Sequence, residues 1–176
     1  ANGPILPGNW AYYPDLGSYG YDPDSAAQRI AALGITRNEA GVMVTSEGVE
    51  VRLILLVPQD TLHQQIAEQI KQGWEAVGIS VDLLVEPHDQ VVARLEAHDY
   101  DAALVDIDLS GTPDPDPYPF WAQSQAQGGQ NYSQWSNRAA SEYLEQARVT
   151  NDYELRTKLY RNFQILFDED LPSLPL

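Results

Sequence analysis

Hydrophobic and polar positions follow two periods along the middle of the chain, and together they predict an alternation of strands and helices. Residues 49–57 read VEVRLILLV, an apolar and β-branched run typical of a strand. In residues 62–77 the apolar side chains recur every three or four positions, which predicts an amphipathic helix that ends at Gly78. Residues 79–85 then alternate apolar and polar, as a half-buried strand does.

A shorter helix around residues 91–95 and a third strand at residues 100–107 complete a β-α-β-α-β order. Strands separated by helices in this way pair in parallel, through right-handed crossovers, with helices covering the sheet. The sequence therefore predicts an α/β (α+β) fold built on a β-α-β-α-β core sheet.

The flanking segments predict further elements. Residues 1–21 are rich in Gly, Pro and Tyr without a period, and we expect an extended N-terminal arm. Asp22-Pro23 opens a helix that Gly34 ends, and residues 42–44 with 49–57 form a hairpin around Glu47-Gly48. Two helices near the end of the chain follow from apolar spacing, and the second starts with a capping box. The residues concerned are Ala140, Tyr143, Leu144 and Ala147, then Asn151 and Glu154 for the box, and Leu155, Leu159, Phe163, Leu166 and Phe167.

Between the third strand and these helices lies a loop with many prolines, acids and aromatics. Residues 113–121 read PDPDPYPFW and residues 128–135 read GGQNYSQW, so we expect neither a helix nor a central strand there. Such a stiff loop suits a surface that binds a ligand with a cationic or polar end. In the alternative interpretation, its aromatic side chains simply cover the core.

Composition limits the classes of function. The chain has 26 acidic and 10 basic residues, a formal net charge of −16, which repels phosphate backbones and argues against nucleic-acid binding. The same charge favours cationic or zwitterionic ligands, or only keeps the protein soluble. The 176 residues include no cysteine, which excludes disulfides and thiol catalysis, and no apolar run long enough for a membrane span or a signal peptide.

Asp106 and Asp108 would share one face of the third strand, where close carboxylates can act as acid and base. With Ser110 and Gly111 they also match half of an EF-hand loop, but Pro117 stands where its bidentate glutamate belongs. The histidines lack metal-ligand spacing, so we expect no metal and no cofactor. A solvated strand end is the plain alternative for both aspartates.

In order, the segments of the chain resemble the C-terminal lobe of the extracellular solute-binding proteins, family 5, which serve peptide-type ABC importers. The matching residues run over essentially all 176 positions. They are Gly3-Pro4-Ile5, Trp10-Ala11-Tyr12, Pro14-Asp15-Leu16, Tyr21-Asp22-Pro23, Leu33-Gly34, Ile66-Ala67-Glu68, Trp74, Val77-Gly78-Ile79, Tyr100-Asp101, Asp114-Pro115-Asp116-Pro117-Tyr118, Phe120-Trp121, Asn131-Tyr132, Leu144-Glu145, Ala147, Asp152, Arg156, Leu159-Tyr160, Gln164-Ile165-Leu166, Asp168 to Asp170 and Pro172 to Leu176.

This resemblance implies a lobe of the periplasmic-binding-protein type II fold. It implies that residues 1–176 form a single domain, part of the second lobe of a two-lobed protein whose first lobe and export or lipid signal are missing here. Such proteins are not enzymes: they capture a peptide or similar solute outside the membrane, in the periplasm or anchored at the cell surface. They then deliver it to the membrane permease of an ABC transporter.

The chain departs from the family where many members carry Gly-Trp and then an aspartate that pairs with a peptide's α-amino group. Here Asp106-Ile107 and Ser110-Gly111 occupy those positions, and Asp108, Asp114 or Asp116 could substitute for the missing aspartate. A sugar, an opine-like compound or a nickel chelate therefore stays open as the ligand, besides a peptide.

We expect eight residues to line or support the ligand site: Asp106, Asp108, Ser110, Tyr118, Trp121, Asn131, Tyr132 and Trp135. Two alternatives come from other classes of function. One is a carboxylate-dependent hydrolase or metal-binding domain that uses Asp106 and Asp108. The other is an interaction module whose acidic face docks onto the permease.

Overall fold

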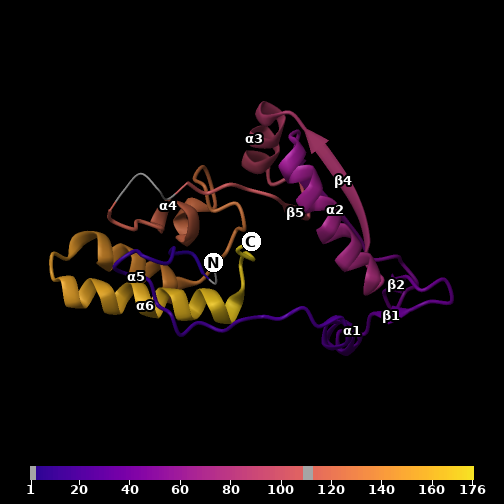
Figure 1. Cartoon of the computed structure of the whole chain (residues 1–176), viewed down its shortest axis with the longest axis horizontal. Helices are drawn as coiled ribbons and strands as arrows, with labels where there is room; N and C mark the ends of the chain where they lie inside the picture. Colours follow the sequence, from indigo (N-terminus) through magenta and orange to yellow (C-terminus); the bar gives the residue numbers. More distant parts are fainter. Residues whose placement is uncertain (1–2, 109–112) are drawn as a thin grey trace. The chain divides into compact units, whose positions relative to one another are not determined.

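The structure is a computed structural model that describes residues 3–108 and 113–176, and its contacts divide the chain into two compact units (Figure 1). The first unit contains residues 1–19 and 107–176, and the second contains residues 20–106. The elements are α1 (Pro23–Ala32), β1 (Thr36–Arg37), β2 (Met43–Val44), β3 (Arg52–Pro58), α2 (Thr61–Ala76), β4 (Ser80–Glu86), α3 (His88–Ala97), β5 (Ala102–Ala103), α4 (Tyr118–Trp121), the 3-10 turn η1 (Gln123–Gln125), α5 (Arg138–Val149) and α6 (Tyr153–Asp170). The expectation of a single domain stays a prediction.

The second unit is built on a three-stranded parallel sheet in the order β4-β3-β5, which confirms the predicted β-α-β-α-β core. The central strand β3 pairs along its whole length with β4, so that Leu55 lies opposite Leu83. Leu55, Val57 and Val81 are buried against Ala67 of α2, as the helical period of that segment predicts.

The loops around this sheet use caps that the sequence reveals. Asp22 and Asp60 cap α1 and α2, each accepting a hydrogen bond from a backbone N–H three residues ahead. Gly78 follows α2 with a φ of 91°, a left-handed conformation that glycine adopts without strain. A Cβ atom at this position would lie 2.8 Å from the carbonyl oxygen of Gly41. The end of α2 is therefore fixed by a close backbone contact as well as by conformation.

The predicted hairpin around residues 47–48 exists in reduced form. Val44 and Glu50 form a single antiparallel bridge, and the N–H of Thr45 donates to the carbonyl of Val49 at 2.8 Å. The strand β2 instead pairs with β1, a partner that the sequence did not indicate.

Helices α5 and α6 form an antiparallel hairpin, and they are the two longest helices of the first unit (Figure 1). Residues 3–19 contain no helix or strand, as expected for an arm, and they cross this hairpin. The side-chain amide of Gln164, fully buried on α6, holds the arm in place: it accepts from the N–H of Tyr13 and donates to the carbonyl of Ala11. Ile5 and Ala11 are buried in the same core as the α6 residues.

Three local predictions were wrong. The third strand was expected over residues 100–107, but β5 has two residues, because the ladder with β3 ends after Leu104 donates to Leu56. The proline loop was expected to hold no helix, yet α4 forms one turn, since proline is tolerated in the first turn of a helix. The N-cap of α6 is Asp152, not Asn151.

Replacing Gly78 by alanine tests the contact at the end of α2. We expect Gly78→Ala to lower the free energy of unfolding by about 1–3 kcal/mol, from the strained φ and the clash with Gly41. Gly73, inside α2 with open space around its Cα, is the control: Gly73→Ala should raise stability by about 0.5–1 kcal/mol. Urea denaturation measures both, and equal effects of the two substitutions would contradict this account of Gly78.

Candidate functional site

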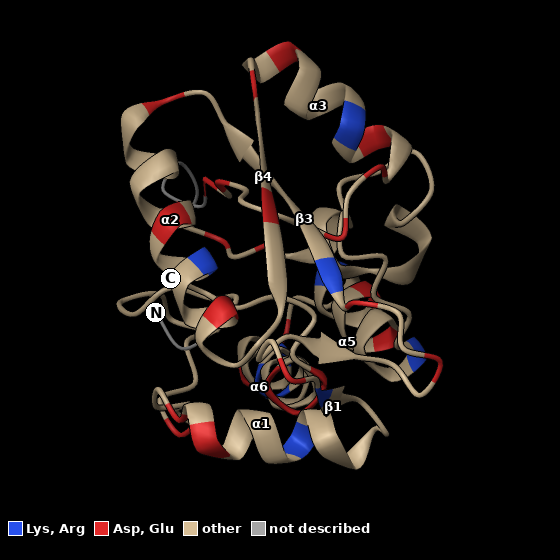
Figure 2. Ribbon diagram, turned by 90° about the vertical axis from the view of Figure 1, so that its right-hand side faces the viewer, with Lys and Arg blue, Asp and Glu red and all other residues tan. Residues whose placement is uncertain are grey.

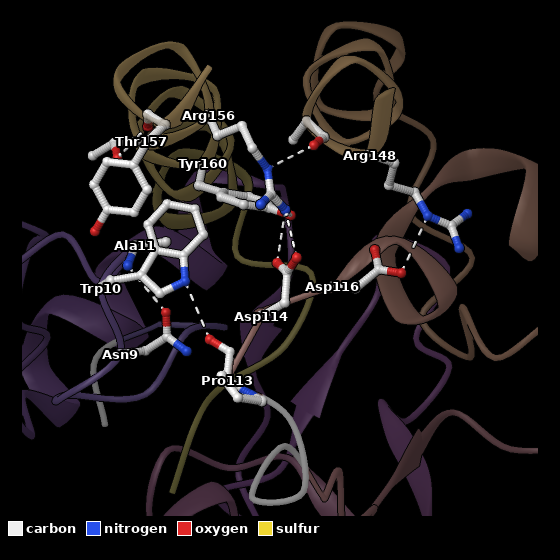
Figure 3. Close-up of polar contacts among 12 residues, drawn as sticks. Asn9, Trp10, Ala11, Pro113, Asp114, Asp116, Arg148, Arg156, Thr157 and Tyr160 are labelled. Atoms are coloured by element: carbon white, nitrogen blue, oxygen red, sulfur yellow. Dashed lines mark hydrogen bonds and ion pairs between the residues drawn. The ribbon is translucent and has the colours of Figure 1, made fainter. Parts of the chain in front are cut away.

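The acidic residues of the proline loop are engaged by arginines within the first unit (Figure 3). Both carboxylate oxygens of Asp114 accept from one guanidinium nitrogen of Arg156, at 2.7 and 2.8 Å. Asp116 pairs with the Nε of Arg148 at 3.1 Å. Because each of these carboxylates already has a cationic partner, neither is presented to a ligand without first breaking an ion pair.

Arg156 is the centre of the larger of these two networks. Its Nε donates to the carbonyl of Ala147 at the end of α5, and its Nη2 also donates to the hydroxyl of Tyr160. The guanidinium carbon lies 5.2 Å from the centre of the Trp10 ring, whose indole N–H donates to the carbonyl of Pro113. The hydrogen bonds that Arg156 donates to Asp114 raise the pKa of Arg156 above its ordinary value, while burial raises the pKa of Tyr160.

Arg148 and Tyr118 form one wall of an open hollow on the first unit. The guanidinium lies 4.4 Å from the centre of the Tyr118 ring, a cation–π geometry, and the tyrosine hydroxyl pairs with Ser124 at 2.9 Å. With Glu145 and Val149 these side chains line a hollow of about 350 Å³. It is shallow and open, and Tyr118 is only half buried.

The two tryptophans of the loop belong to the core of the first unit. Trp121 is 7% exposed and meets Phe167 edge-on, with ring centres 4.8 Å apart. Trp135 is 9% exposed and packs against Phe163 and Phe167. Its indole N–H donates to Asp170 at 2.8 Å. These contacts support the alternative interpretation that the aromatic residues cover the core.

Asn131 is fully buried, and its side chain holds the turn that precedes Trp135. The amide nitrogen donates to the carbonyls of Ala122 and Trp135, and the amide oxygen accepts from the hydroxyl of Ser133 and the N–H of Trp135. All of the hydrogen-bonding capacity of this amide is used inside the protein, and these bonds fix the shape of the loop.

Asp106 and Asp108 lie beyond the end of β5, so they do not share a strand face as the sequence suggested. Both are exposed; Asp106 belongs to the second unit and Asp108 to the first. Tyr132 is half buried, and Ser110 lies outside the described residues. The ligand-binding roles of all eight predicted residues stay predictions, and Asp106 and Asp108 are the ones whose charged groups face solvent.

Sequence reasoning missed His63, the first-turn residue of α2 whose ring contacts Asp106. Its Nε2 lies 3.2 Å from the Asp106 carboxylate, and its Nδ1 lies 2.6 Å from the carboxylate of Asp60. Asp60 and Asp106 follow the carboxyl ends of β3 and β5, which are adjacent parallel strands. In α/β sheets this edge is where ligands bind. The signal available in the sequence was the spacing of a capping aspartate and a histidine three residues later.

Three further observations concern charge and polarity in the rest of the described residues. Acidic residues occur in helices, strands and connections of the chain (Figure 2). In residues 3–108 and 113–176, no group of three His, Asp or Glu side chains is arranged to hold a metal ion. Within the same residues, no helix combines the length and the apolar character that crossing a bilayer requires.

Comparison with known proteins decides the family. Residues 1–131 match the model of the bacterial extracellular solute-binding proteins, family 5 Middle. The chain belongs to this family of solute-binding proteins. The family assignment confirms the resemblance deduced from the ordered segments, and with it the periplasmic-binding-protein type II fold class.

Individual relatives are distant in sequence and close in fold. The dipeptide-binding protein of Escherichia coli (strain K12) is 23% identical over 171 residues, which cover 97% of this chain and 31% of that protein. The oligopeptide-binding protein AppA of Bacillus subtilis, solved with a nonapeptide, superposes with a TM-score of 0.87 at 25% identity, over 98% of this chain and 35% of AppA. NikA of Brucella suis, solved with Fe(III)-EDTA, gives a TM-score of 0.86 at 21% identity, over 100% of this chain and 36% of NikA. The chain thus spans about a third of the length of these relatives.

Substituting Arg156 tests the network that holds the loop. We expect Arg156→Ala to lower the free energy of unfolding by about 1–2 kcal/mol, because a charge-assisted hydrogen-bond pair and a cation–π contact are lost. The matched control is Arg138→Ala, since Arg138 is 85% exposed and, in the part of the chain that the structure describes, forms its ion pair with Glu142 on its own helix; it should leave stability unchanged. Chemical denaturation monitored by tryptophan fluorescence measures both, and an equal loss in the control would refute the network's role.

Asp170 should make the packing of Trp135 sensitive to acid. Hydrogen bonds from Asn137 and Trp135 lower the pKa of Asp170 below its ordinary 3.8. The carboxylate therefore contributes stability at all pH values above 3.8, and this contribution is lost as the pH falls through the lower value of the folded state. We expect Asp170→Asn to be less stable than the unmodified chain at neutral pH and to lose less stability on acidification. Near-ultraviolet circular dichroism between neutral and strongly acidic pH measures this, and parallel acid profiles of the two proteins would contradict it.

Proposed function

We propose that this chain captures a solute outside the cytoplasmic membrane, as part of the substrate-binding component of an ABC importer. The observation that supports this most strongly is the family match over residues 1–131. The fold similarity to AppA, which was solved with a bound nonapeptide, supports it further. The family consists of solute-binding proteins, whereas a hydrolase built on Asp106 and Asp108 would leave the family match unexplained.

In this proposal residues 1–176 form part of the second lobe of a two-lobed receptor, as the 31% coverage of the Escherichia coli relative suggests. A first lobe of the same protein would close over the solute from the opposite side, and a membrane permease would receive it. Contacts made only in the closed form then shift the population towards closure. An isolated lobe binds weakly, because half of the contacts are missing.

We infer a peptide, or another solute that carries a positively charged group, as the ligand. Relatives named for dipeptides support the peptide class, and the net charge of −16 favours a cationic or zwitterionic solute. Asp106 is the carboxylate that we assign to the charged group, since its side chain is 85% exposed at the ligand edge of the sheet. Asp114 and Asp116 are less suited, because their charges are neutralised by arginines.

Removing the charge of Asp106 tests this assignment. The solute is first identified by mass spectrometry of the intact receptor purified from cells, and its affinity is then measured by calorimetry. We expect Asp106→Asn to weaken binding about tenfold or more, the loss of one charge-assisted hydrogen bond, with an unchanged melting temperature.

The control for this experiment is Glu96→Gln, which removes the same charge from an exposed position on α3. It should leave the affinity unchanged. Equal affinities of the Asp106→Asn variant and the unmodified receptor would refute the assignment of Asp106. A protein that carries no solute and turns over an ester or glycoside substrate would refute the receptor function itself.

A further inference from the structure

The imidazole ring of His63 lies between two carboxylates that come from different segments of the second unit. Its Nδ1 is 2.6 Å from Oδ2 of Asp60, and its Nε2 is 3.2 Å from Oδ2 of Asp106. The His63 side chain is 14% exposed, whereas Asp106 is 85% exposed. One ring edge is therefore fixed at the start of α2, and the other faces a carboxylate that is otherwise surrounded by solvent.

The contact with Asp60 determines which ring nitrogen keeps its proton. Asp60 caps α2, accepting the backbone N–H of His63, and this hydrogen bond is the main reason why the pKa of Asp60 is lowered. A carboxylate that stays ionised at 2.6 Å holds a proton on Nδ1. The ring nitrogen that is a donor in the imidazolium and an acceptor in the neutral ring is then Nε2, which faces Asp106.

The two protonation states of His63 interact with the Asp106 carboxylate in opposite ways. In the imidazolium, the Nε2–H donates to the Asp106 carboxylate and forms a charge-assisted hydrogen bond. In the neutral ring, a lone pair on Nε2 faces a carboxylate oxygen. Both atoms are acceptors, so no hydrogen bond forms between them. The Asp106 carboxylate then accepts hydrogen bonds from another donor, either water or a ligand.

We propose that His63 is a proton-dependent positioning residue, which holds Asp106 when protonated and releases it to a cationic group of the solute when neutral. This proposal rests on the assignment of Asp106 to the solute made above. A proton on His63 and a positive group of the solute compete for the same carboxylate. Binding of such a solute therefore releases a proton, and acidification weakens binding.

The charges around the ring support a simple two-way competition. In the described residues, Asp60 and Asp106 are the charged side chains in ion-pair contact with His63, and neither carboxylate has a Lys or Arg within ion-pair distance. The cluster carries a net charge of −1 when His63 is protonated and −2 when it is neutral, by adding one imidazolium to two carboxylates. Loss of the proton thus also strengthens the attraction for a cation.

The position of the cluster makes this competition relevant to binding. Asp60 follows β3 and Asp106 follows β5, and these strands are neighbours in one parallel sheet. Asp60 is fixed by its capping role, so only the Asp106 side of the arrangement can open. The switch therefore acts on the exposed carboxylate without disturbing the start of α2.

The experiment uses the intact receptor without ligand, so that its result does not depend on knowing the solute. The side-chain carboxyl carbon and the backbone amide of Asp106 are followed by NMR from about pH 5 to pH 8, the range in which histidines titrate. We expect both signals to change in one step together with the ring signals of His63. In the His63→Gln and His63→Asn variants, checked for folding by circular dichroism, this step should be absent.

His88→Gln is the matched control, because His88 is an exposed histidine at the start of α3. It should keep the Asp106 step unchanged. The proposal is overturned if the Asp106 signals stay constant over this range, or if their step persists in the folded His63 variants. Either outcome leaves the receptor function standing, since no ligand is involved.

A second measurement links the switch to binding in the intact receptor. With a dipeptide, Ala-Ala, as the probe, calorimetry in two buffers of different ionisation enthalpy should show proton release on binding near neutral pH. Affinity should rise with pH by at most a factor of about 10 per unit, the limit for one linked proton, and the His63→Gln variant should show neither effect. Binding of the dipeptide without proton release would refute the competition. Absence of dipeptide binding would count against the peptide class alone, and the ligand-free titration would still decide the role of His63.

Discussion

The guanidinium of Arg156 is the contact on which the irregular part of the first unit depends. The arm and the proline loop form no sheet ladder in the described residues, so side-chain bonds must replace it. One planar cation reaches Asp114 of the loop, the carbonyl of Ala147 and the hydroxyl of Tyr160, and it stacks near Trp10 of the arm. A lysine could not reproduce this, because its ammonium lacks the rigid fork of donors. Gln164 plays the same part on a smaller scale, since one buried amide bonds the arm twice.

This constraint explains why the candidate site was predictable only in part. The residue types of the loop suggest ligand binding, but their partners lie far away in the sequence: Asp114 pairs with a residue 42 positions later, and Trp135 donates to one 35 positions later. No local pattern reveals such pairs, so carboxylates that neutralise arginines look the same as carboxylates free for a ligand. His63 was missed for the related reason that its second partner, Asp106, comes from another strand end.

The fold was easier to predict, because periodicity reports burial directly. The helix α2 and the strand β4 follow their apolar patterns within one residue, whereas β3 begins three residues later than its pattern. The parallel order follows from the alternation of strands and helices. The prediction of the third strand failed because the apolar run continues after the ladder with β3 has ended at the hydrogen bond from Leu104 to Leu56. The cap of α6 moved by one residue because Asn151 and Asp152 are both good caps, and only backbone geometry chooses between them. The family resemblance added the two-lobed context, which no periodicity contains.

An acidic protein has many carboxylates, so acidity alone does not select the one that meets a ligand. The carboxylates differ in whether the side chain that pairs with them can lose its charge. Asp116 and Asp114 are paired with Arg148 and Arg156, and an arginine side chain does not lose its proton in proteins. Asp106 faces a histidine, whose charge is present or absent within the physiological range. A carboxylate that is paired with a histidine can exchange this partner for a solute with a small loss of free energy. It also has a hydrogen-bonding partner before the solute binds. In the proposed function, Asp106 is therefore the carboxylate that exchanges its partner for a solute, whereas Asp114 and Asp116 keep their arginines.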